Sequence, residues 1–432
     1  MAGETVVSSG DPLAVMLYSV SLHSEIEKRC VFTSQMAGPI SKESMAIAKR
    51  ERMQTTPDMP IVVISDLAQT AGDRVTCDLF HIVNGKPVMG DREMEGRGVP
   101  LTFSTDEVKI NQTRFPIKPG GRMTRKRTSH NLRRIARANM SSYFARLNDE
   151  IIQSHLAGAR GSEVSDDWAL PLASDPDFAD IMINPLLPPT ANRYFVAGGG
   201  DAASDVSSTD ALLLEDIDVI STTIRDMPFP PSPIKVMTAK GDQEITVYCL
   251  MVTERQWHYI TTAGGQNVQT NWRQAVAEAT KRQMLTQHPL FTGECGYWNG
   301  FLIKKMPRAI RFNPGDEVSV QPTTGGNPVA SNAGVSLDRA ILLGGQALAL
   351  ARGDNQGSRN AAFPVRWTEV LRDHGNSIEI GGGMIDGKKK LRFTGTDGAI
   401  SDYGVCVIDS YAPEPKSDAG QTLRSALANG RR

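Results

Sequence analysis

Apolar residues recur at helical spacing in two separate stretches near the start of the chain. The first, residues 11–30, predicts a short amphipathic helix behind a possible cap at Asp11. The second predicts a helix that begins near Thr128 or Ser129 and ends at Gly158. Some thirty helical residues would span roughly 45 Å. We expect an apolar stripe of this helix to pack on a sheet, while arginines line its other side. The stripe consists of Leu132, Ile135, Ala136, Met140, Tyr143, Phe144, Leu147, Ile151 and Leu156.

Residues 60–118 instead show the β-branched and alternating runs that are typical of strands. The runs are PIVVIS, DRVTCDLFHI, LTFS, EVKIN and RFPIK, and Asn84-Gly85 after the second run predicts a type I′ hairpin turn. Large apolar residues are few for this length, so we expect a long β excursion that has no core of its own and lies on a neighbour. The residues between Cys30 and Pro60 are polar and loosely patterned, which is typical of an arm.

The chain after Gly158 mixes both patterns. Residues 161–210 predict an irregular loop or small insertion, and the clusters Gly198–Gly200 and Gly381–Gly383 are expected to be turns. From residue 211 the predicted helices are TDALLLEDIDVISTTIRDM, TERQWHYITT and NWRQAVAEATKRQML, and the predicted strands are EITVYCLMV, FLIKKMPRAIRF, SIEIGGGMIDGKKKLRFTG and DYGVCVIDSYA. SLDRAILLGGQALALARG is expected to run from strand into helix. Helices and strands alternate without a fixed repeat, so the sequence predicts an α+β fold.

A chain of 432 residues is long enough to bury a large core and is expected to fold as two or three subdomains. Its composition, 40% hydrophobic with a formal net charge of −1, is that of an ordinary soluble protein. The sequence has no run of about eighteen apolar residues, so it predicts no membrane helix. The N-terminus does not resemble a secretory signal. The five cysteines never form a Cys-x-x-Cys pair, which favours a reduced chain made in the cytoplasm.

Charge is distributed unevenly along this nearly neutral chain. Eleven basic residues and no acid lie between Lys109 and Arg146, whereas twelve acids and one base lie between Gly161 and Ile224. Three interpretations are open. The sequence favours the first, in which the basic block of one copy pairs with the acidic block of another copy. In the second, each block is a solvated face, and in the third, the basic block contacts nucleic acid. The candidate inter-subunit residues are Arg122, Arg125, Lys126, Arg127, Arg133, Arg134 and Arg137, with Asp166, Asp167, Asp175 and Asp177 in the acidic block.

Sequence signatures of an enzyme are missing. No Gly-x-Ser-x-Gly elbow, His-Glu-x-x-His helix or Walker loop occurs. His288 and Cys295 could form a nucleophile dyad, but no third group orients them, so a structural histidine beside a buried thiol is expected. The acids of Glu215–Asp218 suit the first turn of a helix better than a metal site. We therefore predict no catalytic residue, no metal ligand and no cofactor.

Five segments in a fixed order carry a resemblance to a known family. They are GDPLAV, GDRVTCDL, EGRGVPLTFSTDEVKI, RRIAR followed by LAGARG, and DGKKKLRFTGTDGAISDYGVCVIDSYA. In this order they resemble tailed-bacteriophage major capsid proteins of the Hong Kong 97 type, and more specifically the podovirus-type coat proteins. The resemblance covers most of residues 10–412 and is weakest over 161–210 and in the tail after Ser417.

The resemblance implies a fold and a function. Its fold has an N-arm at residues 1–54, an E-loop at 55–122, a peripheral domain with a long spine helix and an acidic loop at 123–210, an axial domain at 211–375, and a return to the peripheral domain with a polar tail at 376–432. The implied function is a major capsid protein that forms pentamers and hexamers of an icosahedral phage head around double-stranded DNA. Implied partners are further copies of the chain, scaffolding, portal and decoration proteins, and packaged DNA bound non-specifically, with no membrane. The alternative is a nucleic-acid-binding protein that uses the basic helix Arg122–Arg137.

Asn84, Gly85 and Lys86, at the predicted hairpin tip, complete the candidate inter-subunit residues. Some members of the wider fold group cross-link their subunits through a Lys–Asn isopeptide bond, and Lys86 has suitable chemistry and position. An exposed lysine at a sheet edge more commonly discourages edge pairing, so no cross-link is assigned.

Overall fold

The computed structural model describes residues 12–38, 55–65, 72–80, 85–101, 103–163, 167–238, 244–262, 266–353, 364–395 and 398–413. The helices are α1 (Pro12–Arg29), α2 (Val31–Met36), α4 (Arg122–Arg127), α5 (Leu132–Ala157), α6 (Asp177–Ile181), α7 (Leu214–Asp226), α8 (Glu254–Thr262) and α9 (Gln266–Thr286), with 3-10 turns η2 (Ala191–Arg193), η3 (Ala203–Asp205) and η4 (Pro289–Phe291). The strands are β1 (Ile61–Ile64), β2 (Arg74–Phe80), β3 (Phe103–Lys109), β4 (Asn111–Ile117), β5 (Tyr194–Val196), β6 (Ile234–Met237), β7 (Glu244–Val252), β8 (Cys295–Trp298), β9 (Phe301–Lys305), β10 (Arg311–Phe312), β11 (Glu317–Val320), β12 (Val329–Asn332), β13 (Leu337–Leu343), β14 (Leu348–Arg352), β15 (Val365–Arg372), β16 (Ser377–Lys390), β17 (Arg392–Thr394), β18 (Ile400–Asp402) and β19 (Val405–Tyr411). Helices and strands are mixed along the chain, which confirms the α+β prediction.

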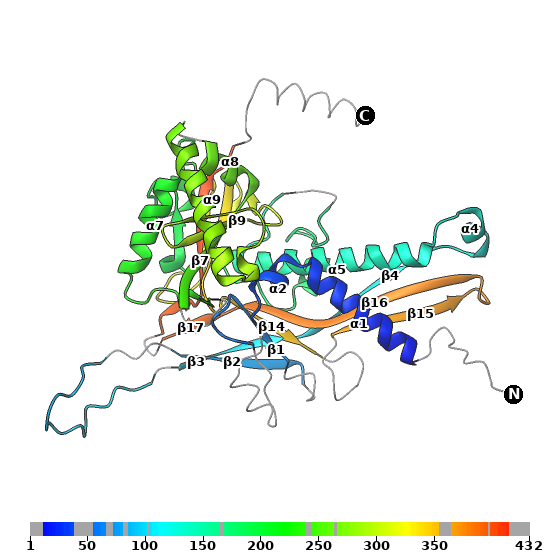
Figure 1. Cartoon of the computed structure of the whole chain (residues 1–432), viewed down its shortest axis with the longest axis horizontal. Helices are drawn as coiled ribbons and strands as arrows, with labels where there is room; N and C mark the ends of the chain where they lie inside the picture. Colours follow the sequence, from blue (N-terminus) through cyan, green and yellow to red (C-terminus); the bar gives the residue numbers. More distant parts are fainter. Residues whose placement is uncertain are drawn as a thin grey trace.

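The upper part of the molecule is built on an eight-stranded sheet (Figure 1). Its strand order is β5-β19-β13-β7-β9-β8, with β10 on β13 and β6 on β7. Along β7, Cys249 and Met251 enter one apolar cluster, and Leu250 and Val252 enter another. The sheet is therefore buried on both faces, with α7 and α8 over the second cluster, and α2 and part of α5 over the first.

The lower, elongated part is built on a five-stranded sheet around β16, the longest strand (Figure 1). β15 and β4 flank the first part of β16, β14 pairs with its last part, and β1 pairs with β14. α1 and α5 cover one face of this sheet, where Leu22, Phe144 and Trp367 share a buried cluster. β4 pairs with β16 alone and carries Pro116, a residue that an edge strand tolerates because it has no N–H to donate.

The long helix predicted from the apolar stripe is α5, with a different start. Its N-cap is Asn131, whose side chain accepts a hydrogen bond from Arg134 N, so the predicted caps Thr128 and Ser129 are wrong. The end at Gly158 is confirmed: Gly158 has φ 70°, and a Cβ there would lie 2.5 Å from Leu187 O. The basic residues before Thr128 form a separate short helix, α4.

The N-terminal helix prediction is confirmed by α1, but the chain after it is more than a polar arm. α2 buries Phe32 and Met36 in the main apolar cluster. The predicted cap Asp11 lies outside the described residues.

The β excursion between residues 55 and 122 is only partly separate from the body of the protein. β1 is fully buried and runs parallel to β14, and β4 belongs to the five-stranded sheet, so these two strands contribute to the core. β2 and β3 pair along their whole length and bury Val75, Leu79 and Val108 against β14 and Phe393. The expectation of an excursion without a core of its own is therefore wrong for all these strands.

The tight hairpin predicted at Asn84-Gly85 does not form the link between β2 and its partner strand. β2 ends by pairing Phe80 with Phe103 of β3, and residues 85–101 form no strand. Asn84 lies outside the described residues. What protrudes from the molecule is a long loop rather than a two-residue turn.

Two further expectations are corrected by strand pairing over long sequence distances. Gly381–Gly383 lie inside β16 rather than in a turn, because α5 crosses the strand there and Gly382 faces Met140 and Phe144. The segment from Ser336 to Gly353 forms two strands, β13 and β14, instead of a strand and a helix. Gly198–Gly200 do form a turn, as predicted.

The sheets do not follow the expected boundaries at residues 210 and 375. β5 and β19, which come from outside residues 211–375, lie in the eight-stranded sheet with strands from inside that range. β14 and β15, which come from inside it, lie in the five-stranded sheet with β16.

Gly387→Ala tests the close approach of β16 to the end of β3. A Cβ at Gly387 would lie 2.0 Å from Lys109 O, a backbone atom that cannot move alone. We expect the free energy of unfolding to fall by about 2–3 kcal/mol, measured by chemical denaturation. Gly381→Ala is the matched control, since its Cβ would meet only the side chain of Thr368. Equal losses in both variants would contradict this packing.

Candidate inter-subunit surfaces

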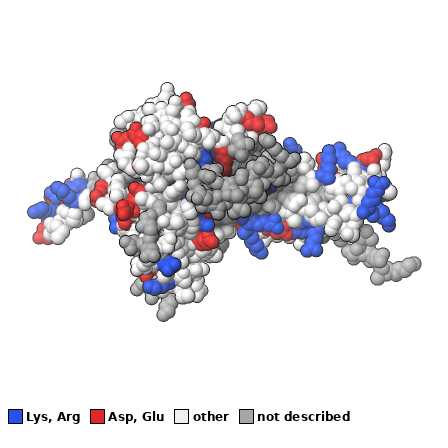
Figure 2. Space-filling model, turned by 90° about the horizontal axis from the view of Figure 1, so that it is seen from above, with Lys and Arg blue, Asp and Glu red and all other residues white. Residues whose placement is uncertain are grey.

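The protruding loop, residues 85–101, is almost entirely exposed. It extends from β2 and β3 at the left end of the molecule and carries charges of both signs (Figures 1 and 2). It exposes Met89, Met94 and Leu101, each by more than half. Gly85 and Lys86, two of the predicted inter-subunit residues, lie at its start. Exposed apolar side chains on a long loop are typical of a surface that a partner covers.

The opposite end of the molecule carries a dense group of basic residues (Figure 2). α4 is held against the turn between β15 and β16, where Arg122 N and Arg125 Nη2 donate to Asn376 O at 3.0 and 3.3 Å. We call the exposed residues Arg122, Lys126, Arg127 and Arg134 the basic tip; within the described ranges none of them has an ion-pair partner.

Two of the predicted inter-subunit arginines pair inside their own chain instead. Arg133 Nη2 lies 2.6 Å from Glu369 Oε1 on β15, and Arg137 Nη2 lies 2.6 Å from Glu25 Oε1 on α1. Arg137 also donates to Ser21. These contacts hold α1 and β15 against α5, so the arginine face of this helix is only partly available to another molecule.

The acidic residues of the other predicted block lie along a different part of α5. Asp175, Asp177 and Asp180 are exposed in and before α6, and Asp167 is exposed at the start of this segment. Arg146 Nη1 and Arg308 Nη2 donate to the backbone carbonyl of Asp167, not to its carboxylate. We call Asp167, Asp175, Asp177 and Asp180 the acidic segment; Asp166 lies outside the described residues. Within one chain the basic tip and the acidic segment do not form ion pairs among the described residues.

The middle of α5 buries polar side chains that the sequence analysis did not single out. Asp149 accepts hydrogen bonds from Val31 N and Phe32 N, at 3.0 and 3.3 Å, and so holds the first turn of α2. Glu150 accepts from Ala169 N and Leu170 N, both at 2.8 Å, and so holds the chain just before the acidic residues of α6. Three consecutive polar residues, Asn148 to Glu150, inside an apolar stripe were the available sequence signal.

Burial shifts the ionisation of this part of α5. Burial raises the pKa of Asp149 to about 7, although the two amide hydrogen bonds favour the charged form. Burial also lowers the pKa of His155 to about 3, and the nearby charge of Lys388 acts in the same direction. Lys388 Nζ in turn donates to Asn148 Oδ1 at 2.9 Å and ties β16 to the helix.

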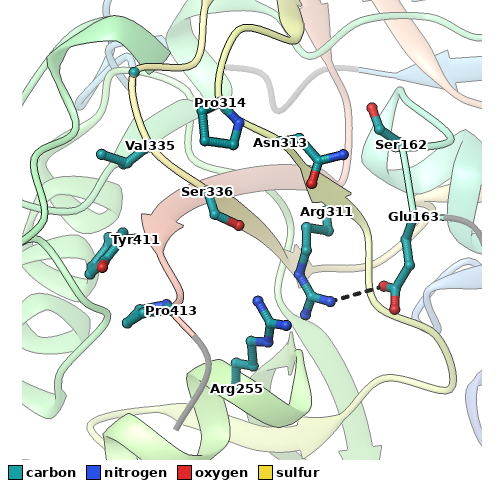
Figure 3. Close-up of a pocket in the computed structure, with 11 residues that line it drawn as sticks. Ser162, Glu163, Arg255, Arg311, Asn313, Pro314, Val335, Ser336, Tyr411 and Pro413 are labelled. Carbon is teal, nitrogen blue, oxygen red and sulfur yellow. Dashed lines mark ion pairs between the residues drawn. The ribbon is translucent and has the colours of Figure 1, made fainter. Parts of the chain in front are cut away.

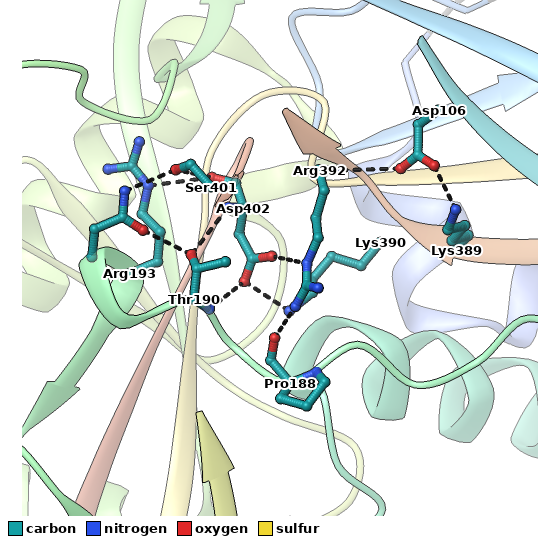
Figure 4. A network of polar contacts seen from close by, with 10 residues as sticks. Asp106, Pro188, Thr190, Arg193, Lys389, Lys390, Arg392, Ser401 and Asp402 are labelled. Carbon is teal, nitrogen blue, oxygen red and sulfur yellow. Dashed lines mark hydrogen bonds and ion pairs between the residues drawn. The ribbon is translucent and has the colours of Figure 1, made fainter. Parts of the chain in front are cut away.

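A second buried polar cluster is centred on Asp402 (Figure 4). Its carboxylate accepts from Lys390 Nζ at 2.8 Å, Arg392 Nε at 2.9 Å and Thr190 N at 3.2 Å. Burial lowers the pKa of Lys390 to about 8, and the charge of Asp402 opposes that shift. All of these partners come from the same chain, so the cluster joins the end of β16 to η2 and β18 as a structural element.

A polar cavity of about 700 Å³ lies beside β10 (Figure 3). Arg311 on its wall pairs with Glu163 at 3.3 Å and with buried Asp338 at 2.6 Å, and Arg255 donates to Ala412 O. Its lining includes no histidine or cysteine, so no nucleophile–base pair of that kind lies here. In the described parts of the chain no cluster of His, Cys, Asp or Glu is arranged to hold a metal ion.

The possible dyad of His288 and Cys295 is used structurally. His288 Nδ1 accepts from Leu290 N at 3.1 Å, and Cys295 Sγ donates to Phe291 O. Burial raises the pKa of the Cys295 thiol, which disfavours the reactive thiolate. Among the helices described, none is long and apolar enough to span a membrane.

Comparison with known proteins identifies the molecule's relatives. The profile of the family described as phage capsid protein matches residues 6–414. The capsid of Ralstonia phage GP4 is 28% identical, with a TM-score of 0.67 over 84% of this chain and 90% of that chain. Two further structures share the fold. The capsid of cyanophage Pam1 is 16% identical, with a TM-score of 0.53 over 83% of this chain and 90% of that chain. The head of Helicobacter pylori bacteriophage KHP40 is 12% identical, with a TM-score of 0.52 over 82% of this chain and 89% of that chain. No curated protein sequence is significantly similar.

Asp149→Asn tests the buried carboxylate that holds α2. The pKa of Asp149 is higher in the folded protein than in the unfolded chain, so its contribution to stability is present at low pH and is lost as pH rises through about 7. The stability of the variant relative to the natural protein should therefore improve between about pH 4 and pH 7, by about 1.4 kcal/mol for each pH unit, and level off above pH 7. Denaturation at several pH values measures this, with the exposed change Asp175→Asn as control. A pH-independent difference for Asp149→Asn would contradict it.

Proposed function

The chain belongs to the phage capsid protein family and has a fold of the Hong Kong 97 type, and on that premise we propose that it is the major capsid protein, the subunit from which the shell is built. Copies assemble into pentamers and hexamers and close an icosahedral head around double-stranded DNA. The chain is made in the host cytoplasm and ends in the virion. Its further partners are scaffolding, portal and decoration proteins.

The observation that carries this proposal is that two exposed surfaces of different character lie at opposite ends of an elongated molecule (Figure 2). The protruding loop leaves the body at one end, and the basic tip lies at the other (Figure 2). Two different surfaces that meet head to tail generate closed rings or lattices of identical subunits. Many modest contacts per copy then give a stable shell.

We assign the parts of the fold as follows. The five-stranded sheet with α5 is the peripheral domain, and α5 is its spine helix. The eight-stranded sheet with α7, α8 and α9 is the axial domain. The protruding loop with β2 and β3 is the E-loop, and α1 with α2 forms the described part of the N-arm.

We further propose that the basic tip meets the acidic segment of a neighbouring copy. Both surfaces are exposed and opposite in charge, and among the described residues no ion pair joins them within the chain. Complementary charges fix the register of contacts and disfavour wrong ones. No cross-link through Lys86 is proposed.

Nucleic-acid binding by the basic tip is the second candidate, and the same unpaired cations support it. It predicts a discrete complex of the chain with DNA whose affinity falls steeply with salt. A chain that binds DNA in this way but forms no particles would replace the capsid proposal.

Replacing residues 86–100 by a short Gly-Ser linker tests the role of the protruding loop. Because β2 and β3 stay paired, we expect a folded chain whose thermal unfolding is nearly unchanged but which forms no particles in negative-stain electron microscopy. Deleting residues 61–117 is the contrasting variant and should unfold the chain, because β1 and β4 belong to the core. Normal shells from the chain without its loop would refute this role.

Arg133 and Arg134 provide a matched pair that separates folding from assembly. Arg134→Glu reverses an exposed charge of the basic tip, so particle yield should fall while stability changes by less than about 0.5 kcal/mol. Arg133→Glu breaks the pair with Glu369 and should cost about 1–2 kcal/mol of folding stability. Light scattering and denaturation measure the two effects. If particle yield is unchanged in Arg134→Glu, the basic tip is a solvated face.

A further inference from the structure

Two helices of the eight-stranded sheet region expose faces that are unlike each other. On α7, Glu215, Val219, Thr222 and Asp226 follow one another at helical spacing and are all exposed, while Ile217, Ile220 and Ile224 are buried on the other side. This face is acidic, with one large apolar side chain, Val219, that is 65% exposed. α7 forms the left flank of the upper part in Figure 1.

The exposed face of α9 is basic and apolar. Arg273, Ala277, Lys281 and Met284 follow at the same spacing, and Met284 is 75% exposed. The opposite side of α9 is anchored by buried Ala275 and Ala279 and by Trp272, which packs edge-to-face on Trp257. α9 lies to the right of α7 in Figure 1.

Both faces are held in fixed orientations by contacts within the chain. Asp218 on α7 accepts from Trp298 Nε1 and Asn299 Nδ2, at 3.0 and 2.9 Å, and Ser221 donates to Asn299 O. These contacts keep the Val219 face turned outward. Among the described residues, Glu215, Asp226 and Arg273 have no ion-pair partner, whereas Lys281 pairs at 2.7 Å with Glu278 of its own helix in an exposed contact.

We propose that the α7 face of one copy docks on the α9 face of the next copy. The proposal rests on the capsid function proposed above and names a contact between subunits within one ring. An antiparallel arrangement places Glu215 beside Lys281 and Asp226 beside Arg273, with Val219 against Ala277 between them.

The dimensions of the two faces agree with this arrangement. At 1.5 Å per residue, the α7 acids are about 16 Å apart and the α9 cations about 12 Å apart, a difference that the long Arg and Lys side chains span. The small side chain of Ala277 leaves room for Val219. Because α7 and α9 are different surfaces, the contact is head-to-tail and repeats around a ring rather than ending at a dimer.

A cross-linking experiment tests the contact directly. Val219→Cys and Ala277→Cys are made in separate full-length chains, and the two are co-assembled and mildly oxidised. The five native cysteines are buried, so they do not compete. We expect disulfide-linked dimers in the mixed particles and none in particles of either variant alone. Since each chain carries one new cysteine, a dimer cannot arise from a bond within a chain.

Charge exchange provides the second measurement. The double variant with Glu215→Lys and Asp226→Lys should form no particles, and neither should the double variant with Arg273→Glu and Lys281→Glu. The variant that combines all four changes should form particles again. Glu317→Lys, at an exposed position of β11, is the control and should assemble normally. Circular dichroism establishes that each variant is folded.

The outcomes separate this inference from the proposed function. Particles without a mixed dimer, or without any effect of the charge reversals, overturn the α7–α9 contact and leave the capsid proposal standing. If the natural chain, supplied with its assembly partners, forms no particles at all, the proposed function itself fails.

Discussion

The structure depends on the passage of α5 across β16. The strand lacks side chains where the helix crosses it, so Met140 and Phe144 reach the backbone at Gly382. Further along the same helix, Asn148 accepts from Lys388 of that strand. Asp149 and Glu150 hold α2 and the segment before α6 through backbone amides. One helix thus organises both sheets and the N-terminal helices, and Asn148, Asp149 and Glu150 reach these hydrogen-bond partners only when all these parts are in place.

The charges of α5 divide into two groups with different tasks. Arg133 and Arg137 neutralise acids of β15 and α1, and these contacts belong to the folded subunit. The residues of the basic tip, Arg122, Lys126, Arg127 and Arg134, face solvent and have no such partner among the described residues. Because exposed charges contribute little to stability, the second group is free to serve recognition without weakening the fold. This division allows one basic segment to stabilise the fold and, in the contact that we propose, to bind another copy of the chain.

A shell needs contacts that are individually weak and collectively specific. The protruding loop, the basic tip and the α7 and α9 faces are all surfaces that this chain leaves open. His288 and Cys295 do not belong to these surfaces, and both have structural hydrogen-bond partners. Errors in a growing lattice can be corrected when each contact is modest, while the sum over many copies holds the closed shell.

Local sequence patterns determined the elements whose neighbours lie close in the chain. The apolar stripe and Gly158 predicted α5 and its end, alternation predicted β2, and the uneven charge marked the basic and acidic blocks. Only the tertiary structure decided that β1 pairs with β14, that Gly381–Gly383 lie within a strand, and that Arg133 and Arg137 are paired in the chain while Arg134 is not. These features depend on residues far apart in sequence, often by more than 200 positions, as for Arg133 and Glu369. A helical or strand period shows which side of an element is buried, but not which residues cover that side. The covering residues are decided by tertiary packing, which matches each glycine, buried carboxylate and edge strand to a partner far away in the sequence.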